Sequence, residues 1–175
     1  MGTLLFLVAL VSFSAARPLS LSNTVGSSMI LQRDKPLASL WGYAGAGVVV
    51  STTLEDGRVF NSTTGQDGIW RAQLPSMPAS SVGMTITFSA SGEKAITITD
   101  VVIGDVLFCS GQSNMQFSVQ MAFNASAELD AIDAFGPFIR VFKAAQSNQD
   151  QPQVDVNAAT PWTRASKGFA QKKKY

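Results

Sequence analysis

The chain of 175 residues has no histidine and only one cysteine, Cys109. Histidine is the side chain that most often activates a nucleophilic serine or cysteine, and it is also a common zinc ligand. Its absence removes the usual base of a hydrolase, and we expect neither a metal ion nor a cofactor. One cysteine also excludes an internal disulfide. Because Cys109 lies in an apolar run, we expect a buried thiol there rather than a nucleophile.

Charged residues are scarce as well, at 14% of the chain with a net charge of +1. Such a balance gives no electrostatic reason to bind nucleic acid, and no basic stripe with interleaved aromatic residues is present. The only basic cluster lies in residues 171–175 (QKKKY), which we interpret as a solvated tail. With 46% hydrophobic residues, the composition is typical of a packed globular protein.

The N-terminus is typical of a secretory signal peptide. Residues 4–11 (LLFLVALV) form an apolar core that is too short to span a bilayer, and Ser14, Ala15 and Ala16 supply small residues for cleavage. No lysine or arginine precedes this core, so an uncleaved anchor is the alternative. The sequons at Asn61 and Asn124 fit export. We therefore expect a signal peptide over 1–16, a secreted or lysosomal product, and no membrane association after cleavage.

Residues 17–102 have the pattern of a small β-sandwich domain. Short apolar or alternating segments are separated by turn signals about every 8–12 residues, which is typical of that architecture. The expected strands cover residues 29–32, 38–42, 48–54, 59–63, 69–74, 84–88 and 95–99. Asp56-Gly57, Asp67-Gly68 and Ser91-Gly92 predict hairpin turns between them.

After Gly104 the pattern changes to that of an α/β domain. Residues 106–109 are apolar on both faces, as in a parallel strand that helices cover. Helical spacing follows from Met115 to Phe123, and Asn124 or Ser126 can cap a second helix that Gly136-Pro137 ends. Residues 138–142 return to strand, and residues 146–157 are polar and loop-like. Since a single strand–helix–strand unit cannot bury both faces of its sheet, 103–170 is predicted to be an incomplete domain.

Ser113 follows the apolar run at a turn that Gly111 permits, near the expected start of a helix. Esterases expose a nucleophilic hydroxyl in this way, and the helix dipole would favour negative charge that develops there. Spacing alone leaves an alternative, in which Ser113 is an ordinary helix cap.

Residues 104–116 (GDVLFCSGQSNMQ) resemble the nucleophile block of the sialate O-acetylesterases, a branch of the SGNH hydrolase superfamily. The resemblance extends to residues 29–33 (MILQR), 41–42 (WG), 67–70 (DGIW) and 123–126 (FNAS), and it covers 25–169. It implies an SGNH-type α/β (flavodoxin-like) hydrolase domain that follows the β-sandwich. Ser113 would attack the O-acetyl ester of a sialic acid, with its backbone N–H as one oxyanion donor. Gln112 and Asn114, which flank it, would shape the turn or contact substrate.

Several of the family's functional residues have no counterpart in this chain. The family takes a glycine and an asparagine of the oxyanion hole, and an Asp–His pair, from later blocks. Residues 162–170 still resemble the family, whereas 171–175 depart from it. A splice variant, a gene-model error or a genuine truncation would each explain this, and we expect a chain that is weakly active or inactive alone.

Other side chains suggest less specific functions. Asp130 and Asp133 lie one helical turn apart and predict a solvated face. Three tryptophans could stack on sugars, although core packing is the simpler interpretation: Trp41, Trp70 and Trp162. The alternative function is a non-catalytic, secreted β-sandwich module that binds glycans or a protein partner.

Overall fold

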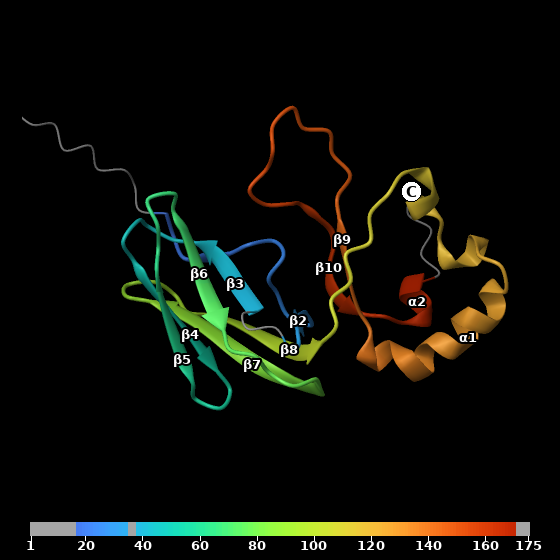
Figure 1. Cartoon of the computed structure of the whole chain (residues 1–175), viewed down its shortest axis with the longest axis horizontal. Coiled ribbons are helices and arrows are strands. Elements are labelled where there is room, and N and C mark those ends of the chain that lie inside the picture. Colours follow the sequence, from blue (N-terminus) through green and yellow to red (C-terminus); the bar gives the residue numbers. More distant parts are fainter. Residues whose placement is uncertain (1–16, 35–37, 171–175) are drawn as a thin grey trace, which may run out of the picture.

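Strands predominate in the protein, as the alternating sequence between residues 29 and 99 predicts. A computed structural model describes residues 17–34 and 38–170 (Figure 1). The expected signal peptide, 1–16, and the basic tail, 171–175, lie outside the described residues. Eight strands come first along the chain: β1 (Ser20–Leu21), β2 (Ile30–Gln32), β3 (Ala38–Tyr43), β4 (Val49–Leu54), β5 (Val59–Thr63), β6 (Ile69–Leu74), β7 (Ser80–Ala90) and β8 (Ile96–Gly104).

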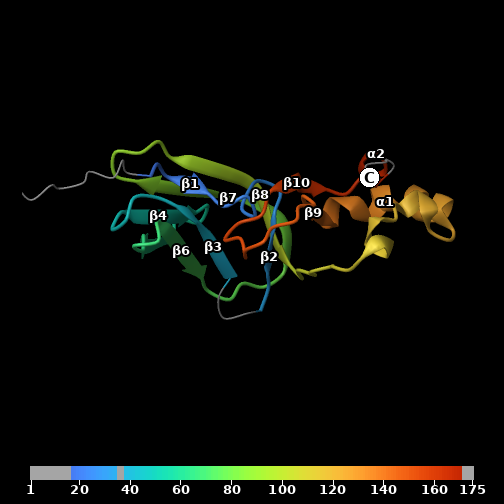
Figure 2. The same cartoon turned by 90° about the horizontal axis from the view of Figure 1, so that it is seen from above.

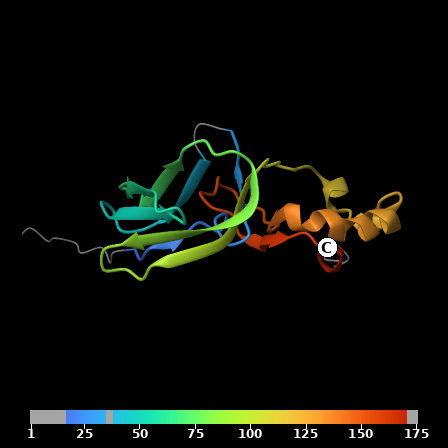
Figure 3. The same ribbon diagram turned by 90° about the horizontal axis from the view of Figure 1, so that it is seen from below.

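These strands form two sheets. The larger sheet has the order β2-β8-β7-β4-β5, and the smaller has the order β1-β3-β6. Their pairs are antiparallel except for β2 with β8, in which Leu31 lies opposite Ile103. The long strands β7 and β8 curve strongly, which gives the larger sheet a curled shape (Figure 3).

Two of the three predicted hairpin turns join paired strands. Gly57 between β4 and β5 has a φ of 85°, and Gly92 between β7 and β8 has a φ of 77°. Glycine adopts this left-handed conformation without steric cost, which explains its place in both turns. Asp67-Gly68 is also a turn, with Gly68 at a φ of 73°, but it is not a hairpin. It leads the chain from β5 in the larger sheet to β6 in the smaller one.

One apolar core lies between the two sheets. In β6, Trp70, Ala72 and Leu74 are buried while Arg71 and Gln73 are exposed, so the period of two determines which face is buried. The Trp70 ring meets Phe88 of the larger sheet at a centroid distance of 5.3 Å. The same core cluster holds Leu40, Val50, Ile86 and Val101, all with no exposed surface.

Gly42 allows three strand segments to pack closely. It lies opposite Leu21 of β1 and Trp70 of β6, and a Cβ atom at this position would overlap the Ser20 carbonyl oxygen and lie 2.8 Å from the Trp70 ring.

We predict that Gly42→Ala lowers the free energy of unfolding by about 1–3 kcal/mol, since overpacked sites force the backbone to shift. Urea denaturation measures this. Gly26→Ala is the control, because a Cβ at Gly26 meets nothing within 4 Å; equal losses for the two variants would disprove the explanation.

The remaining elements lie toward the other end of the molecule (Figures 1 and 2). They are three 3-10 helices, two α-helices and two strands: η1 (Ser113–Gln116), η2 (Val119–Met121), α1 (Ala125–Phe135), η3 (Gly136–Phe138), β9 (Arg140–Ala144), β10 (Ala158–Arg164) and α2 (Lys167–Ala170). The helix predicted after Asn124 is present, and Asn124 occupies its N-cap position. The continuous helix expected from Met115 to Phe123 is replaced by η1 and η2.

The predicted parallel strand–helix–strand unit is wrong in two respects. Residues 106–109 form no strand, and β9 pairs antiparallel with β10, a strand that the sequence did not indicate. The apolar run is uncovered: Leu107 is 84% exposed, Phe108 is 92% exposed, and the Cys109 thiol is exposed rather than buried. A parallel strand depends on strands at both sides and helices on its faces, and the described residues supply neither.

The segment from β9 to β10 attaches to the strand-rich part by polar contacts. Asp155 accepts hydrogen bonds from the Ser22 hydroxyl at 3.0 Å and the Tyr43 hydroxyl at 3.2 Å. Burial, followed by the nearby Asp155 carboxylate, raises the pKa of Tyr43. The Trp162 indole donates to the Thr24 carbonyl at 2.8 Å. Trp162 and Trp41 pack against the core and Trp70 lies within it, which favours the packing interpretation for all three.

Candidate functional site

Ser113 is the first residue of η1 and is exposed to solvent. Gln112, rather than Ser113, occupies the N-cap position, and no side chain caps this helix. The Met115 backbone N–H donates to the Gln112 carbonyl at 2.9 Å, which closes the turn. The Met115 side chain lies over Gly111, where a Cβ atom would approach its Cγ to 2.7 Å. The turn therefore leaves Ser113 exposed, and the helix-cap alternative does not describe its position.

Within the part of the chain that the structure describes, the residues beside Ser113 form no hydrogen-bond network with it. The Gln112 and Asn114 side chains are also exposed, and among the described residues none of these three side chains makes a hydrogen bond. A serine hydroxyl needs an adjacent acceptor for its proton before it becomes a good nucleophile. The structure thus brings the three predicted site residues together at one exposed turn, and none of the residues that it describes forms a hydrogen bond to them as a base.

The entry into this segment is held by β2. The Gln32 side-chain oxygen accepts the Val106 N–H at 2.9 Å, and the Arg33 N–H donates to the Gly104 carbonyl at 2.8 Å. The Arg33 guanidinium contacts the Asp105 carboxylate at 2.9 Å, and this hydrogen bond lowers the pKa of Asp105. The sequence predicts a strand over residues 29–32 and a resemblance over 29–33, but it does not predict these contacts. They fix the start of the segment, whereas the rest of the described chain makes no comparable hydrogen bonds to residues 107–111.

Asp100 is the most strongly perturbed carboxyl group of the described residues. Arg164 donates to both of its oxygens, Ser28 donates at 2.9 Å, and the buried Arg140 guanidinium lies 3.2 Å away. The hydrogen bond from Arg164 is the largest cause of a pKa lowered to about 2, and the Ser28 hydroxyl and the Arg140 charge act in the same direction. A carboxylate that is so weakly basic and bound by two arginines is suited to holding β8 against β9 and β10, not to accepting a proton.

Asp130 and Asp133 are both exposed on α1, as the sequence predicts for a solvated face, and both contact Lys167 of α2. The Lys167 ammonium group lies 2.6 Å from Asp130, and the Lys167 backbone N–H donates to Asp133. This pair connects α1 with α2 and, mainly through the Asp130 hydrogen bond, raises the pKa of Lys167.

Metal ligands do not gather anywhere in the part of the chain that the structure describes, where no group of three or more His, Cys, Asp or Glu side chains is found. Within the same residues, no helix has the length and apolar character needed to cross a membrane. The two sequon asparagines, Asn61 in β5 and Asn124 before α1, are both exposed. Asn124 has a φ of 60°, a conformation that asparagine tolerates better than most residues.

Comparison with known proteins gives a consistent family of relatives, although no protein-family model matches the chain. The sialate O-acetylesterase of Rattus norvegicus is 29% identical over 173 residues, which cover 94% of this chain and 32% of that protein. The Mus musculus enzyme is 31% identical over 172 residues, covering 91% and 32%, and the Homo sapiens enzyme is 28% identical, covering 92% and 33%. The chain therefore spans about a third of the length of these relatives.

A solved structure supports the fold. The crystal structure of a carbohydrate acetylesterase from Xanthomonas citri matches with a TM-score of 0.75 and 23% sequence identity, over 86% of this chain and 33% of that one. At this identity the match concerns the fold alone. The sequence relatives confirm the resemblance predicted from residues 104–116: along 90% or more of its length, the chain is similar to about a third of a sialate O-acetylesterase.

Proposed function

We propose that this chain carries the nucleophile of a sialate O-acetylesterase and that the catalytic base is supplied by polypeptide outside the chain. The single observation that carries the proposal is the exposed Ser113 hydroxyl, at a tight turn, in a chain that is similar to acetylesterases along 90% or more of its length. The substrate would be an O-acetylated sialic acid or a related acetylated sugar.

The proposed reaction proceeds through an acetyl-enzyme. The Ser113 Oγ attacks the acetyl carbonyl carbon as its proton passes to a base, and the resulting oxyanion accepts a hydrogen bond from the Ser113 backbone N–H. The intermediate then collapses, the sugar oxygen leaves with a proton, and the acetyl group stays on Ser113. Water next attacks the acetyl ester and releases acetate. Gln112 and Asn114 would shape the turn and contact the sugar.

The base cannot be a histidine of this chain, because the sequence has none. Asp100 within β8 and Asp105 directly after β8 are each bound to arginine, which lowers the pKa of both. An acceptor with a lowered pKa is a poor general base at neutral pH.

We also propose a division of the chain into two parts. Residues 17–102 form a β-sandwich domain, and residues 103–170 form the beginning of an SGNH-type hydrolase domain. The rest of that domain is needed for activity.

The exposed apolar side chains support this division. Leu107, Phe108 and Phe123 are each more than four-fifths exposed, although large apolar residues gain roughly 1.5–3 kcal/mol each on burial. A complete hydrolase domain would cover them. The same proposal explains why the apolar run has no strand partners within the described residues.

A hybrid chain tests the proposal. Residues 1–169 would be joined to the remaining two thirds of the Rattus norvegicus relative, and acetate release from an O-acetylated sialoside would be followed. We expect turnover in the hybrid and its loss by a factor of about 10⁶ in Ser113→Ala, the scale of a missing serine nucleophile. Ser110→Ala is the matched control, because Ser110 is also exposed and lies three residues earlier. A folded hybrid that releases acetate despite Ser113→Ala would contradict the assignment.

A further inference from the structure

The ladder between β2 and β8 ends where the chain leaves the strand-rich part and passes toward η1 (Figure 1). β2 is the end strand of the larger sheet and runs parallel to β8. The Val102 N–H donates to the Met29 carbonyl at 3.1 Å, and the Arg33 N–H donates to the Gly104 carbonyl at 2.8 Å. Since the bonds of a parallel ladder are evenly spaced, the next partner of the Arg33 carbonyl would be the Val106 N–H.

A side-chain amide occupies that step of the ladder. The Val106 N–H donates to Gln32 Oε1 at 2.9 Å, and Gln32 Nε2 donates to the Arg33 carbonyl at 3.2 Å. The Gln32 amide therefore lies between the two backbone groups that a regular strand pair would join directly, and it satisfies both. Because the amide is bound at both ends, it fixes the separation between the Arg33 and Val106 backbones.

An ion pair lies beside this bridge. The Arg33 guanidinium donates to the Asp105 carboxylate at 2.9 Å, and this hydrogen bond is the main cause of the lowered pKa of Asp105, to which the Gln32 side chain also contributes. The Arg33 and Asp105 side chains are 43% and 61% exposed, whereas Gln32 is half-buried within β2. An ion pair so exposed contributes little by itself. The amide of Gln32 is therefore the contact that holds the end of the ladder.

The bridge is the last hold on the chain before the turn that carries Ser113. Among the described residues, the next hydrogen bond along the chain after that of Val106 joins the Met115 N–H to the Gln112 carbonyl, within the turn itself. The direction in which the segment leaves β8 is therefore set at Val106. A displacement of about 1 Å at a reacting group can reduce the rate by roughly 10²-fold, so this direction matters for a nucleophile.

Resting on the proposed function, we propose that Gln32 is a positioning residue for Ser113. Its amide continues the β2–β8 ladder by one step and so directs the segment that carries the nucleophile. Without the amide, the Val106 N–H loses its partner or bonds directly to the Arg33 carbonyl, which draws the segment toward β2. Either change shifts the Ser113 Oγ relative to the base and the oxyanion donors that the rest of the hydrolase domain supplies.

Gln32→Met tests the proposal, because methionine has a similar length but cannot donate a hydrogen bond, and its thioether is a weak acceptor. In the isolated chain, hydrogen exchange of the Val106 amide, followed by NMR, is expected to be about fivefold faster, the factor that one lost hydrogen bond gives. In the hybrid with the Rattus norvegicus relative, kcat per active site is expected to fall about 10–100-fold. KM should change by less than about threefold, because binding tolerates a displaced nucleophile better than the reaction does.

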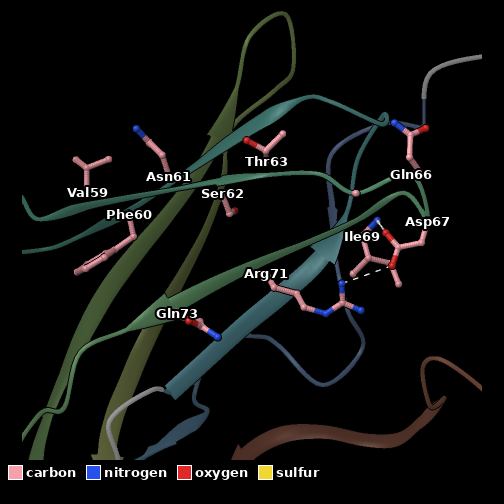
Figure 4. A pocket seen from close by; sticks show the side chains of 11 residues that line it. Val59, Phe60, Asn61, Ser62, Thr63, Gln66, Asp67, Ile69, Arg71 and Gln73 are labelled. Carbon is pink, nitrogen blue, oxygen red and sulfur yellow. Dashed lines mark hydrogen bonds and ion pairs between the residues drawn. The ribbon is translucent and has the colours of Figure 1, made fainter.

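Two precautions separate positioning from folding. Active sites are counted by the fluorophosphonate bound at completion, so that a misfolded fraction does not lower kcat per site. Gln73→Met is the matched control: Gln73 is exposed in β6, beside the open depression in Figure 4, and takes part in none of the interactions drawn there. The control is expected to leave both Val106 exchange and kcat unchanged.

Two results would overturn the proposal. Equal exchange at Val106 in Gln32→Met and the wild type would show that the bridge does not hold the segment. A hybrid with Gln32→Met whose folded fraction falls but whose kcat per site is unchanged would show a structural role alone. Failure of the proposed function gives a different result, since the Ser113→Ala hybrid would then stay active while Val106 exchange still reports on Gln32.

Discussion

The purified chain is expected to hydrolyse an O-acetylated sialoside about 10⁶ times more slowly than a complete sialate O-acetylesterase. A serine hydrolase that loses its base loses about this factor in turnover, which corresponds to roughly 8 kcal/mol of transition-state stabilisation. The chain has no histidine, and its exposed Ser113 has no hydrogen-bonded base among the described residues. Enzymatic detection of released acetate measures the rate.

The comparison requires a folded chain and a fully active reference, such as the complete Rattus norvegicus relative assayed under the same conditions. Ser113→Ala is expected to leave the residual rate of the isolated chain nearly unchanged, because an unactivated hydroxyl contributes little. Turnover near that of the reference, abolished by Ser113→Ala, would show that a base other than histidine operates within the chain and would refute this part of the account.

Asp100→Asn is expected to lower the free energy of unfolding by about 3–5 kcal/mol. The Arg140 side chain is only 1% exposed, so the substitution leaves a buried guanidinium without its anionic partner, which is the costly way to break such a pair. Asparagine also tolerates the left-handed backbone at this position, where φ is 59°, so the change tests the charge rather than the backbone conformation. Chemical denaturation followed by tryptophan fluorescence measures the loss. Asp150→Asn, in an exposed loop, is the control and should change stability by less than about 0.5 kcal/mol.

The stability that the Asp100 carboxylate contributes is predicted to depend on pH. The folded-state pKa of Asp100 is about 2, below the value of roughly 3.9 expected in the unfolded chain. A lowered pKa contributes stability that is fully present above the unfolded value and is lost as the pH falls from about 4 toward 2. Wild-type protein should therefore lose more stability than Asp100→Asn across this window. Parallel curves for the two proteins would show that Asp100 is not responsible.

Local sequence patterns predicted the strands well because the alternation of buried and exposed side chains within a strand depends on nearby residues. Alternation in residues 69–74 correctly placed Trp70 and Leu74 in the core, and Gly57 and Gly92 correctly marked hairpins. The turn at Gly68 shows the limit of this reasoning. Its Asp-Gly pair specifies a turn, but the choice of sheet for the next strand depends on packing between distant residues, and β6 joins β3 instead of β5.

Residues 106–109 were mispredicted for a different reason. An apolar run has the composition of a buried strand, yet strands exist only in pairs, and pairing partners are not encoded in the run itself. In the structure this segment is exposed beyond the contact between Val106 and Gln32. β9 was predicted from its own residues, whereas its partner β10 was missed because residues 158–164 have a weak strand pattern.

The candidate site was only partly accessible from sequence. The turn at Gly111 and the position of Ser113 follow from a local motif, and the structure places that serine in solvent. The Asp100 cluster was not predicted, since it joins Ser28, Arg140 and Arg164, which lie 72, 40 and 64 residues from Asp100 along the chain. Charged residues at such separations give no pattern that reveals their contact before the fold is known.

The most direct test of the central claim is covalent labelling by a fluorophosphonate, which reacts with a serine only when a base activates it. The account predicts that the isolated chain stays unlabelled, whereas the hybrid with the remaining two thirds of the Rattus norvegicus relative is labelled at Ser113, as located by peptide mass spectrometry. Labelling of Ser113 in the isolated chain, or of another serine in an active hybrid, would contradict it.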